Sequence, residues 1–357
     1  MNKCQATTKI GKLCSRNSLS EEKYCLQHLK IYGEIRTKKY KYLIGTTEIF
    51  ELVSPKYKKH IYLFSDVHNR ESKCEKDSIE LKYFIEQIIQ STSKKIDFFL
   101  EYGYIAKDEE KRPEYKDNYL NDIGKYFKDC LTVKKTNCRF KNLRIHYADI
   151  RFRNNDNILE KLYRTLGSLT QNNNYDIDSW RDYLKLEFPS FWNNTLDYMK
   201  EFENIYQKSK INKQILSIQD QEISNLLVSY IDNEKIAKYE ILKSAVDNFL
   251  GIKNLNTDEF REALNNIFNS LEAFIAILVD FYTLGRIFRD FIDKSSPNYI
   301  LVYAGNSHID NIREILLELE FEIIESSYQL MESNLFQCID ISMFTQPFFS
   351  KNFFVLE

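Results

Sequence analysis

Two apolar segments of the sequence end in residues that can do chemistry. Residues 61–64 are isoleucine, tyrosine, leucine and phenylalanine, and Asp66 and His68 follow closely. Residues 299–304 form a second apolar run, which leads to His308. Because alternate residues of a strand share a face, we expect Asp66 and His68 to lie side by side. Carboxylates and imidazoles at strand ends can ligate a divalent metal, or can serve as a general base and the group that orients it.

Two further apolar runs also end in charged residues. Residues 96–100 lead to Glu101, and residues 143–149 end at Asp149, with Arg151 just beyond. Open α/β sheets hold their sites at the carboxyl ends of parallel strands, so we expect these side chains to meet at one edge. The alternative for each run is a strand that ends in a solvated loop.

Helical segments separate these runs and indicate how the strands are ordered. Apolar residues recur at helical spacing over residues 77–90, residues 119–131 can form a helix, and residues 311–320 form an amphipathic one. A strand, a helix and another strand in succession imply a parallel crossover. We therefore predict an α/β fold with a central, mostly parallel sheet flanked by helices, in a main domain at residues 43–357.

The remaining segments add a helical region and further strands to this domain. Residues 157–294 are almost continuously helical in pattern, which predicts a long helical insertion. Residues 42–53 indicate a strand or hairpin, and residues 321–324 and 336–341 indicate final strands. The aromatic tail at residues 344–353 is expected to pack on the core.

Other polar and aromatic residues are assigned mainly to structure. His146 faces away from the charged end of its strand, so we predict a hydrogen-bonded sheet histidine. Arg286 and Arg289 have acids four residues later, and they can form surface ion pairs or face the site. Helical spacing places one aromatic group in the core: Trp180, Phe188, Phe191 and Trp192.

The composition is that of a soluble globular protein. The chain has 357 residues, a formal charge of −2 and 43% hydrophobic residues, which suits a main domain with an appendage. No apolar run approaches the roughly 20 residues that cross a bilayer, and the N-terminus lacks the apolar region of a signal peptide. We therefore expect a cytoplasmic protein without a membrane span.

The first 28 residues contain three cysteines and one histidine, which make one tetrahedral zinc set. Cys4 and Cys14 flank a turn, and Cys25 and His28 have the two-residue gap of a zinc knuckle. A segment this short and polar needs a metal in order to fold. The chain has seven cysteines, an odd number, so metal binding explains them better than a disulfide framework. The alternative is a flexible basic tail.

Residues 1–42 form a basic module. They hold ten Lys/Arg and three Asp/Glu, so the rest of the chain has a net charge of −9. A basic surface can bind nucleic acid or a protein partner. The pattern Cys-x-Ala-x-Thr-x-x-Gly-x-x-Cys, followed by Tyr-Cys-x-x-His, resembles a small zinc-binding motif of phages and large DNA viruses. That resemblance implies a virus-encoded protein in a host cell or virion.

Four motifs of the main domain resemble those of the TraB, Tiki and erythromycin-esterase-like superfamily. They are Ser65-Asp66-Val67-His68, Leu100-Glu101, Asp149-Ile150-Arg151 and Gly305-Asn306-Ser307-His308. The family has two Gly-x-x-His motifs, with a glutamate and an arginine between them, and this chain differs in having Ser65 at the first glycine. Several members are metal-dependent hydrolases. The resemblance implies that His68, Glu101 and His308 surround a reaction centre.

These observations favour a hydrolase, peptidase- or esterase-like, with an unknown substrate. In a metal-dependent version, His68, Glu101 and His308 hold a divalent ion that activates water, and Arg151 stabilises the oxyanion. In a metal-free version, one of the two histidines is the general base, and Glu101 or Asp66 orients it. The alternative is a non-catalytic protein that retains the fold, either virion-associated or binding nucleic acid or protein.

Counting histidines argues against a calcineurin-like metallophosphoesterase, which also begins with Asp-x-His. Such a site needs a second bridging aspartate and several further histidines. This chain has five histidines, of which His28 belongs to the predicted zinc set and His60 begins a strand.

The zinc set predicts the metal content of the purified protein. We expect about one tightly held zinc per chain, bound by Cys4, Cys14, Cys25 and His28. Elemental analysis should show this zinc lost from a chain shortened to begin near residue 43. Full zinc content in the shortened chain would contradict the assignment.

Overall fold

The computed structural model describes most of the main domain. The described residues are 14–15, 39–69, 71–74, 76–103, 118–131, 138–151, 158–170, 182, 196–251, 256–291, 295–329 and 336–350. Of the predicted zinc set, Cys14 is described and buried. Cys4, Cys25 and His28 lie outside the described residues, as does the aromatic group around Trp180.

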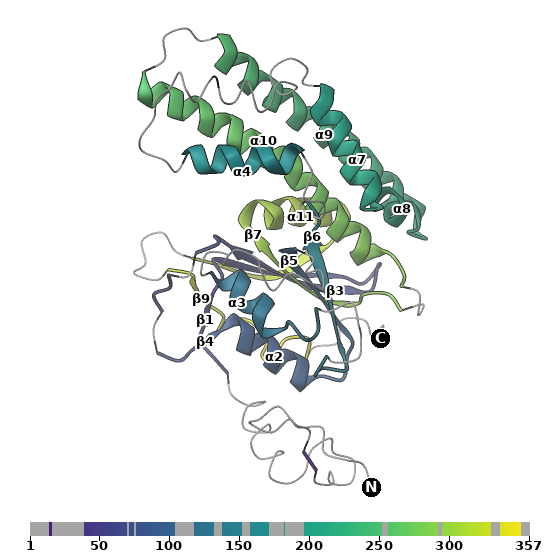
Figure 1. The fold of residues 1–357 in the computed structure, drawn as a ribbon. Coiled ribbons are helices and arrows are strands. Elements are labelled where there is room, and N and C mark those ends of the chain that lie inside the picture. The colour runs from purple at the N-terminus through teal and green to yellow at the C-terminus, as the bar shows by residue number, and fades with distance from the viewer. Residues whose placement is uncertain are drawn as a thin grey trace.

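A six-stranded sheet forms the centre of the molecule (Figure 1). In spatial order its strands are β6 (Leu143–Asp149), β5 (Ile96–Gly103), β7 (Tyr299–Gly305), β3 (Lys59–Asp66), β2 (Glu48–Ser54) and β8 (Glu322–Tyr328). The neighbours from β6 to β3 are parallel, and β2 is antiparallel to both β3 and β8. The predicted mixed α/β fold with a mostly parallel sheet is confirmed.

The parallel strands end at a common edge because their registers coincide. Asp66 at the end of β3 pairs with Gly305 at the end of β7. Gly103 of β5 pairs with Asp149 of β6 in the same way. The predicted parallel relation of β3 and β5 holds, but β7 lies between them. The strand at the centre of the sheet is therefore supplied by a segment about 200 residues later in the chain than β5.

Alternation along the buried strands divides the core into two layers. Residues of one alternation, among them Phe99 and Val302, face the long helical insertion. The residues between them, such as Phe98 and Leu301, face the opposite side of the sheet. All eight residues of β3 are buried, as expected of a strand covered on both faces. The sheet therefore needs helices on each side, and the structure provides them.

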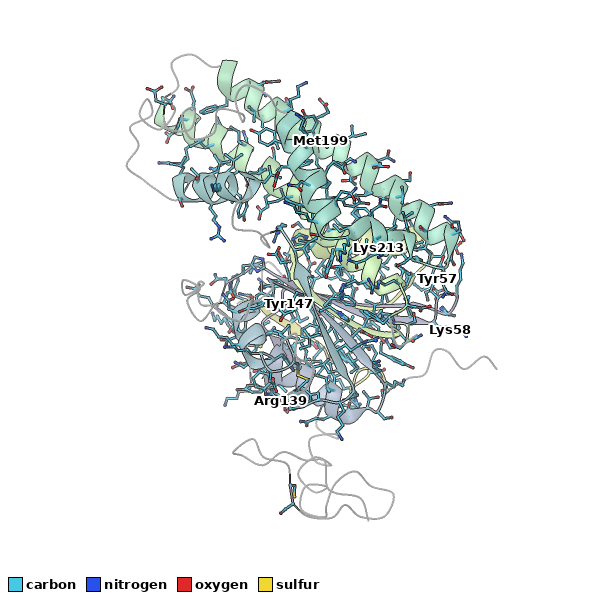
Figure 2. All side chains as sticks on the ribbon, turned by 45° about the vertical axis from the view of Figure 1, so that its right-hand side comes forward. Tyr57, Lys58, Arg139, Tyr147, Met199 and Lys213 are labelled. Carbon is cyan, nitrogen blue, oxygen red and sulfur yellow. A yellow bond between two sulfur atoms is a disulfide. The ribbon has the colours of Figure 1, made fainter. Side chains whose placement is uncertain are left out.

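One face of the sheet is covered by a single helix and by the end of the helical insertion, and two shorter helices cover the other face (Figure 1). The first group comprises α4 (Ile158–Thr170), α7 (Leu196–Lys208), α8 (Ile211–Leu216), α9 (Gln221–Gly251) and α10 (Thr257–Phe288), with α11 (Asn306–Glu318) next to the sheet. The second comprises α2 (Leu81–Ser91) and α3 (Tyr119–Tyr126). Figure 2 shows Met199 among the helices and Arg139 at the opposite side of the molecule.

Helix α10 links the insertion to the sheet. A capping box at Asn256 and Glu259 satisfies its first amide groups. Among the described residues it is the one helix long and apolar enough to cross a membrane, and 72% of its most apolar window is buried inside the protein. Such burial is typical of a core helix, and it places Asp280 in an apolar environment.

A small second sheet corrects the prediction for residues 42–53. Strand β1 (Tyr42–Ile44) pairs with β4 (Ser78–Glu80) and β9 (Cys338–Asp340), whereas β2 belongs to the large sheet. Gly45, with φ of 97°, separates β1 from β2. Because glycine adopts positive φ without steric cost, the chain can turn here from one sheet to the other.

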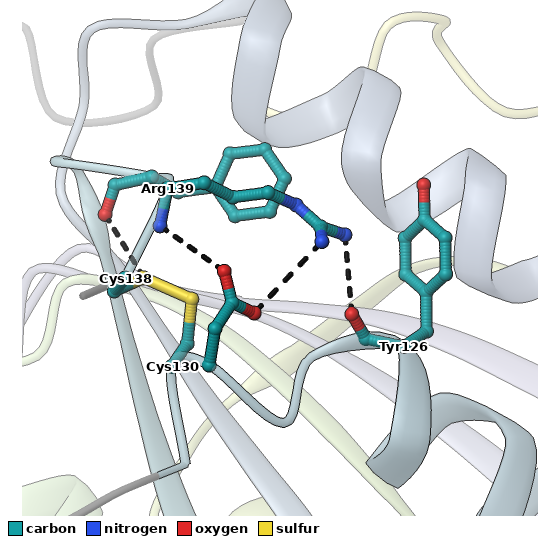
Figure 3. The surroundings of a disulfide bond; sticks show 6 residues. Tyr126, Cys130, Cys138 and Arg139 are labelled. Carbon is teal, nitrogen blue, oxygen red and sulfur yellow. Dashed lines mark hydrogen bonds and ion pairs between the residues drawn. A yellow bond between two sulfur atoms is a disulfide. The ribbon is translucent and has the colours of Figure 1, made fainter. Parts of the chain in front are cut away.

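Two disulfides correct the expectation that metal binding explains the cysteines better than disulfides, but none of their four cysteines belongs to the predicted zinc set. Cys74 pairs with Cys338 across 264 residues, and Cys130 pairs with Cys138 in the loop after α3. Figure 3 shows the second disulfide beside Arg139, whose guanidinium donates to the carbonyl of Tyr126. Pairing over such a separation depends on the fold, so cysteine spacing alone could not indicate it.

The aromatic tail packs against the face of the sheet that α2 and α3 cover, as predicted for its described part. Phe344, Phe348 and Phe349 are buried. The ring of Phe348 stacks on Tyr62 with centroids 4.0 Å apart, and it meets the edge of Phe84 at 4.8 Å. The tail is thus part of the core.

This packing predicts a stability difference between two residues of the same segment. Phe348→Ala should lower the free energy of unfolding by about 3–5 kcal/mol, because it leaves a cavity beside Tyr62. Met343 is 77% exposed, so Met343→Ala should cost less than about 0.5 kcal/mol. Denaturant unfolding measures both. Equal effects would contradict the packing of the tail.

Candidate functional site

Glu101 is the centre of a buried cluster at the carboxyl edge of the sheet. It is only 5% exposed. Its Oε1 accepts a hydrogen bond from Arg151 Nη2 at 2.7 Å and lies 3.1 Å from His308 Nε2. Its Oε2 accepts from the backbone N–H of Gly305 at 2.7 Å and lies 3.6 Å from His68 Nε2. The predicted convergence of these side chains is confirmed.

His68 reaches this cluster through an unusual backbone conformation. Strand β3 ends at Asp66, and His68 has φ of 54°, in the left-handed region that non-glycine residues seldom occupy. The turn places His68 Nδ1 2.8 Å from Asp66 Oδ2. The predicted contact is therefore present, but a turn produces it and not the strand period. Strained conformations of this kind cluster at functional sites.

The two histidines differ in exposure. The side chain of His68 is 43% exposed, whereas that of His308 is 5% exposed. Asp66, the partner of His68, is fully buried. Within the cluster, His68 is therefore the imidazole that a solvent molecule can reach.

His308 lies in the first turn of α11 and is held from both sides. Its Nδ1 donates to Asp280 Oδ1 at 2.6 Å, and its Nε2 donates to Glu101. Asp280 also accepts from Asn311 Nδ2 at 2.9 Å. Sequence reasoning missed Asp280, which lies within a helix and not at a strand end. The available signal was a single carboxylate in the apolar part of α10.

Arg151 is enclosed by two carboxylates. Its Nε donates to Asp149 Oδ1 at 3.0 Å, and its Nη2 donates to Glu101. The side chain is 8% exposed. This placement makes Arg151 a counter-ion of Glu101. The contact of Arg151 with an oxyanion stays a prediction.

Small residues at two positions allow the cluster to close. A Cβ added at Gly305 would lie 3.3 Å from His68 Nε2 and 3.4 Å from Glu101 Oε2, tighter than most such contacts. Ser65, which replaces the glycine of the resembled motif, is buried, and its hydroxyl donates to Glu48 at 3.3 Å. The serine is therefore accommodated inside the sheet.

Electrostatics set the protonation of the buried pair. Burial opposes charge on Glu101, but the charges of His308, Arg151 and His68 hold its pKa well below the usual value. Burial also lowers the pKa of His308, but Glu101 and Asp280 outweigh it and raise that pKa to about 10. At neutral pH, Glu101 is thus a carboxylate and His308 an imidazolium.

The pKa of His68 is raised as well. Burial acts to lower it, but the hydrogen bond to Asp66 and the charges of Glu101 and Asp66 have the larger combined effect. The proton on Nδ1 belongs to the bond with Asp66, so Nε2 is the nitrogen that gains or loses a proton.

The cluster does not fit a metal-ligand set in this arrangement. Both oxygens of Glu101 accept hydrogen bonds from within the protein, and both ring nitrogens of His308 donate to carboxylates. Within the ranges that the structure describes, no group of three or more His, Cys, Asp or Glu side chains is placed to hold a metal ion. The cluster is an ion-paired network.

Two further predictions concern residues outside this cluster. His146 is buried, donates from Nε2 to Asp97 at 2.8 Å and accepts at Nδ1 from Arg286 at 3.0 Å, so the predicted sheet histidine is confirmed. Arg286 therefore binds His146 and does not reach the Glu101 cluster. Arg289 packs over the ring of Phe291. Its predicted ion-pair partner, Asp293, lies outside the described residues.

Comparisons of this chain with protein-family models, with curated proteins and with solved structures find no match.

The raised pKa of His308 predicts how stability depends on pH. A histidine whose pKa is higher in the folded state stabilises the protein fully below its unfolded pKa of 6.5 and loses this contribution as pH rises to about 10. His308→Gln should therefore flatten the decline in unfolding free energy between those pH values. His146→Gln is the matched control, because burial lowers the pKa of His146 to about 4, outside this window.

Denaturant unfolding across this pH range measures both variants. Identical alkaline slopes for wild type and His308→Gln would show that His308 is not protonated by its two acids.

Proposed function

We propose that this protein is a hydrolase in which His68 acts as general base on a water molecule. The observation that supports this most is the Asp66–His68 pair, exposed on one side and backed by the ionised Glu101 network. A histidine oriented by a buried carboxylate is a recurring arrangement for general-base catalysis.

The geometry supports a specific division of roles. Asp66 accepts the Nδ1 proton and fixes the tautomer, which leaves Nε2 to take a proton from water. The attacking water would add to a carbonyl carbon of an ester or peptide, and His68 would then return the proton to the leaving group. The first turn of α11, next to His68, would place partial positive charge near the oxyanion.

Glu101, Arg151 and His308 act as positioning residues in this proposal. Glu101 forms ion pairs with Arg151 and His308. Its Oε2 lies 3.6 Å from His68 Nε2. The imidazolium that forms during catalysis would be stabilised by this carboxylate and by Asp66. The raised pKa of His68 agrees with this role, because Asp66 and Glu101 both favour its charged form.

A metal-dependent version assigns His68, Glu101 and His308 as ligands of a divalent ion, which would supply a water of lowered pKa. It requires these side chains to give up their present hydrogen bonds. Chelator treatment followed by addition of divalent ions separates the two versions, since activity that resists chelators supports the histidine base.

A second candidate is a non-catalytic binding protein that retains the fold. The saturated hydrogen bonding of Glu101 favours it, because a fully paired buried network can serve structure alone. The basic module at residues 1–42 would then bind nucleic acid or a protein partner.

The hydrolase proposal predicts the behaviour of His68 variants. His68→Ala should lower turnover of a responsive ester or peptide substrate roughly 100- to 10,000-fold, with little change in melting temperature, because the side chain is partly exposed. Asn69→Ala, at the exposed neighbouring position, is the matched control and should retain turnover.

The pH profile gives an independent readout. A base must be neutral, so kcat/KM should rise with pH through the pKa of His68, above 6.5. Asp66→Asn should move this inflection to lower pH and reduce the rate. Full activity of His68→Ala would refute the proposal and favour the binding protein.

A further inference from the structure

A second cluster of charged residues lies toward the amino ends of the parallel strands, away from the Glu101 cluster. Asp97, at the start of β5, is four residues before Glu101, which corresponds to about 13 Å along the strand. Asp97 is 1% exposed and accepts two hydrogen bonds from Arg144, at 2.6 and 2.7 Å. The charge of this carboxylate is therefore compensated by Arg144.

Arg286 joins this cluster through a neutral histidine. Burial lowers the pKa of His146 to about 4, so its ring carries one proton at neutral pH. That proton lies on Nε2, which donates to Asp97, and Nδ1 accepts from Arg286 Nη1 at 3.0 Å. A neutral imidazole does not balance the charge of Arg286.

Arg289 follows one helical turn later and lies close to Arg286. Its guanidinium lies 5.3 Å from the ring centroid of Phe291. Burial lowers the pKa of Arg289, and the charge of Arg286 lowers it further, as expected of two neighbouring cations. Across the described parts of the chain, neither arginine forms an ion pair, and Arg289 forms no hydrogen bond.

Both arginines are partly withdrawn from solvent, and no acid among the described residues compensates their charge. The Nε atoms of Arg286 and Arg289 are buried and have no hydrogen-bond partner in the part of the chain that the structure describes. Both residues are of intermediate exposure, so part of each side chain remains in contact with solvent. Two adjacent guanidinium groups in such a place repel each other unless an anion joins them.

A third guanidinium, whose charge Asp97 compensates, lies in the same surroundings. The guanidinium of Arg144 lies 4.1 Å from the centroid of the same Phe291 ring. Ser295 accepts from Arg144 at 2.5 Å and from Lys95 at 3.2 Å. Two acids follow these arginines in the sequence. The charge of Asp290 acts on the buried Lys59, and Asp293 lies outside the described residues.

We propose that Arg286 and Arg289 form a binding site for a phosphoryl group. A guanidinium presents a planar fork of donors that matches phosphate oxygens, and two forks match a dianion in charge. The ligand would be inorganic phosphate or a small phosphorylated molecule. This site lies toward the amino ends of the parallel strands, away from the Glu101 cluster. It is therefore independent of hydrolysis at His68.

Equilibrium dialysis of the full chain against inorganic phosphate, at constant ionic strength, tests this site. We expect saturable binding of one phosphate per chain and weaker binding of acetate. Arg289→Gln should weaken phosphate binding at least roughly tenfold, the loss expected for one charge-assisted contact. Arg289→Lys retains the charge without the fork and should give an intermediate affinity.

Arg313→Gln is the matched control. Arg313 also lies over a phenylalanine ring, that of Phe50 at 4.6 Å, but it has an acid partner in Asp310 at 2.9 Å. This variant should bind phosphate as the wild type does. Absence of saturable binding, equal binding of acetate, or undiminished binding by Arg289→Gln would each overturn the proposal. Unchanged melting temperatures without phosphate confirm that the variants are folded.

Discussion

The buried carboxylate of Glu101 imposes the main constraint on this structure. Removing a charged group from water costs several kcal/mol unless partners of opposite charge and hydrogen bonds replace the solvent. Arg151 supplies one partner from just beyond β6, His308 another from α11, and the Gly305 amide a third from the end of β7. Their meeting requires β7 to lie beside β5, with its end at the same edge of the sheet. The strand order and the charge cluster therefore depend on each other.

The cluster continues as an alternation of acids and bases. His308 forms ion pairs with Asp280 and Glu101. Arg151 forms ion pairs with Glu101 and Asp149. This order leaves His68 as the exposed member, with Asp66 behind it. A rigid, ionised network next to one solvent-accessible imidazole is suited to general-base chemistry, because the base is oriented before a substrate arrives. The Arg286 and Arg289 pair lies apart from this order, without an acid partner among the described residues.

The strand ends were predictable from the sequence because an apolar run that stops at a charged residue has a direct physical meaning. Glu101 and His308 follow such runs, and parallel strands bring their ends together. Asp280 could not be found in this way, because its partner lies 28 residues later and helix periodicity does not reveal contact with another helix. The position of β7 depends on tertiary packing. The turn at His68 depends on a local conformation that residue type disfavours.

The protonation states of the two histidines test the account most directly. Nuclear magnetic resonance of the ring carbons and nitrogens, followed from pH 5 to 11, would assign each titration with the help of His68→Ala and His308→Gln. We expect His308 to remain an imidazolium until the pH approaches about 10, and His68 to titrate above 6.5 with its remaining proton on Nδ1. A His308 that loses its proton near 6.5 would contradict the ion-paired network around Glu101.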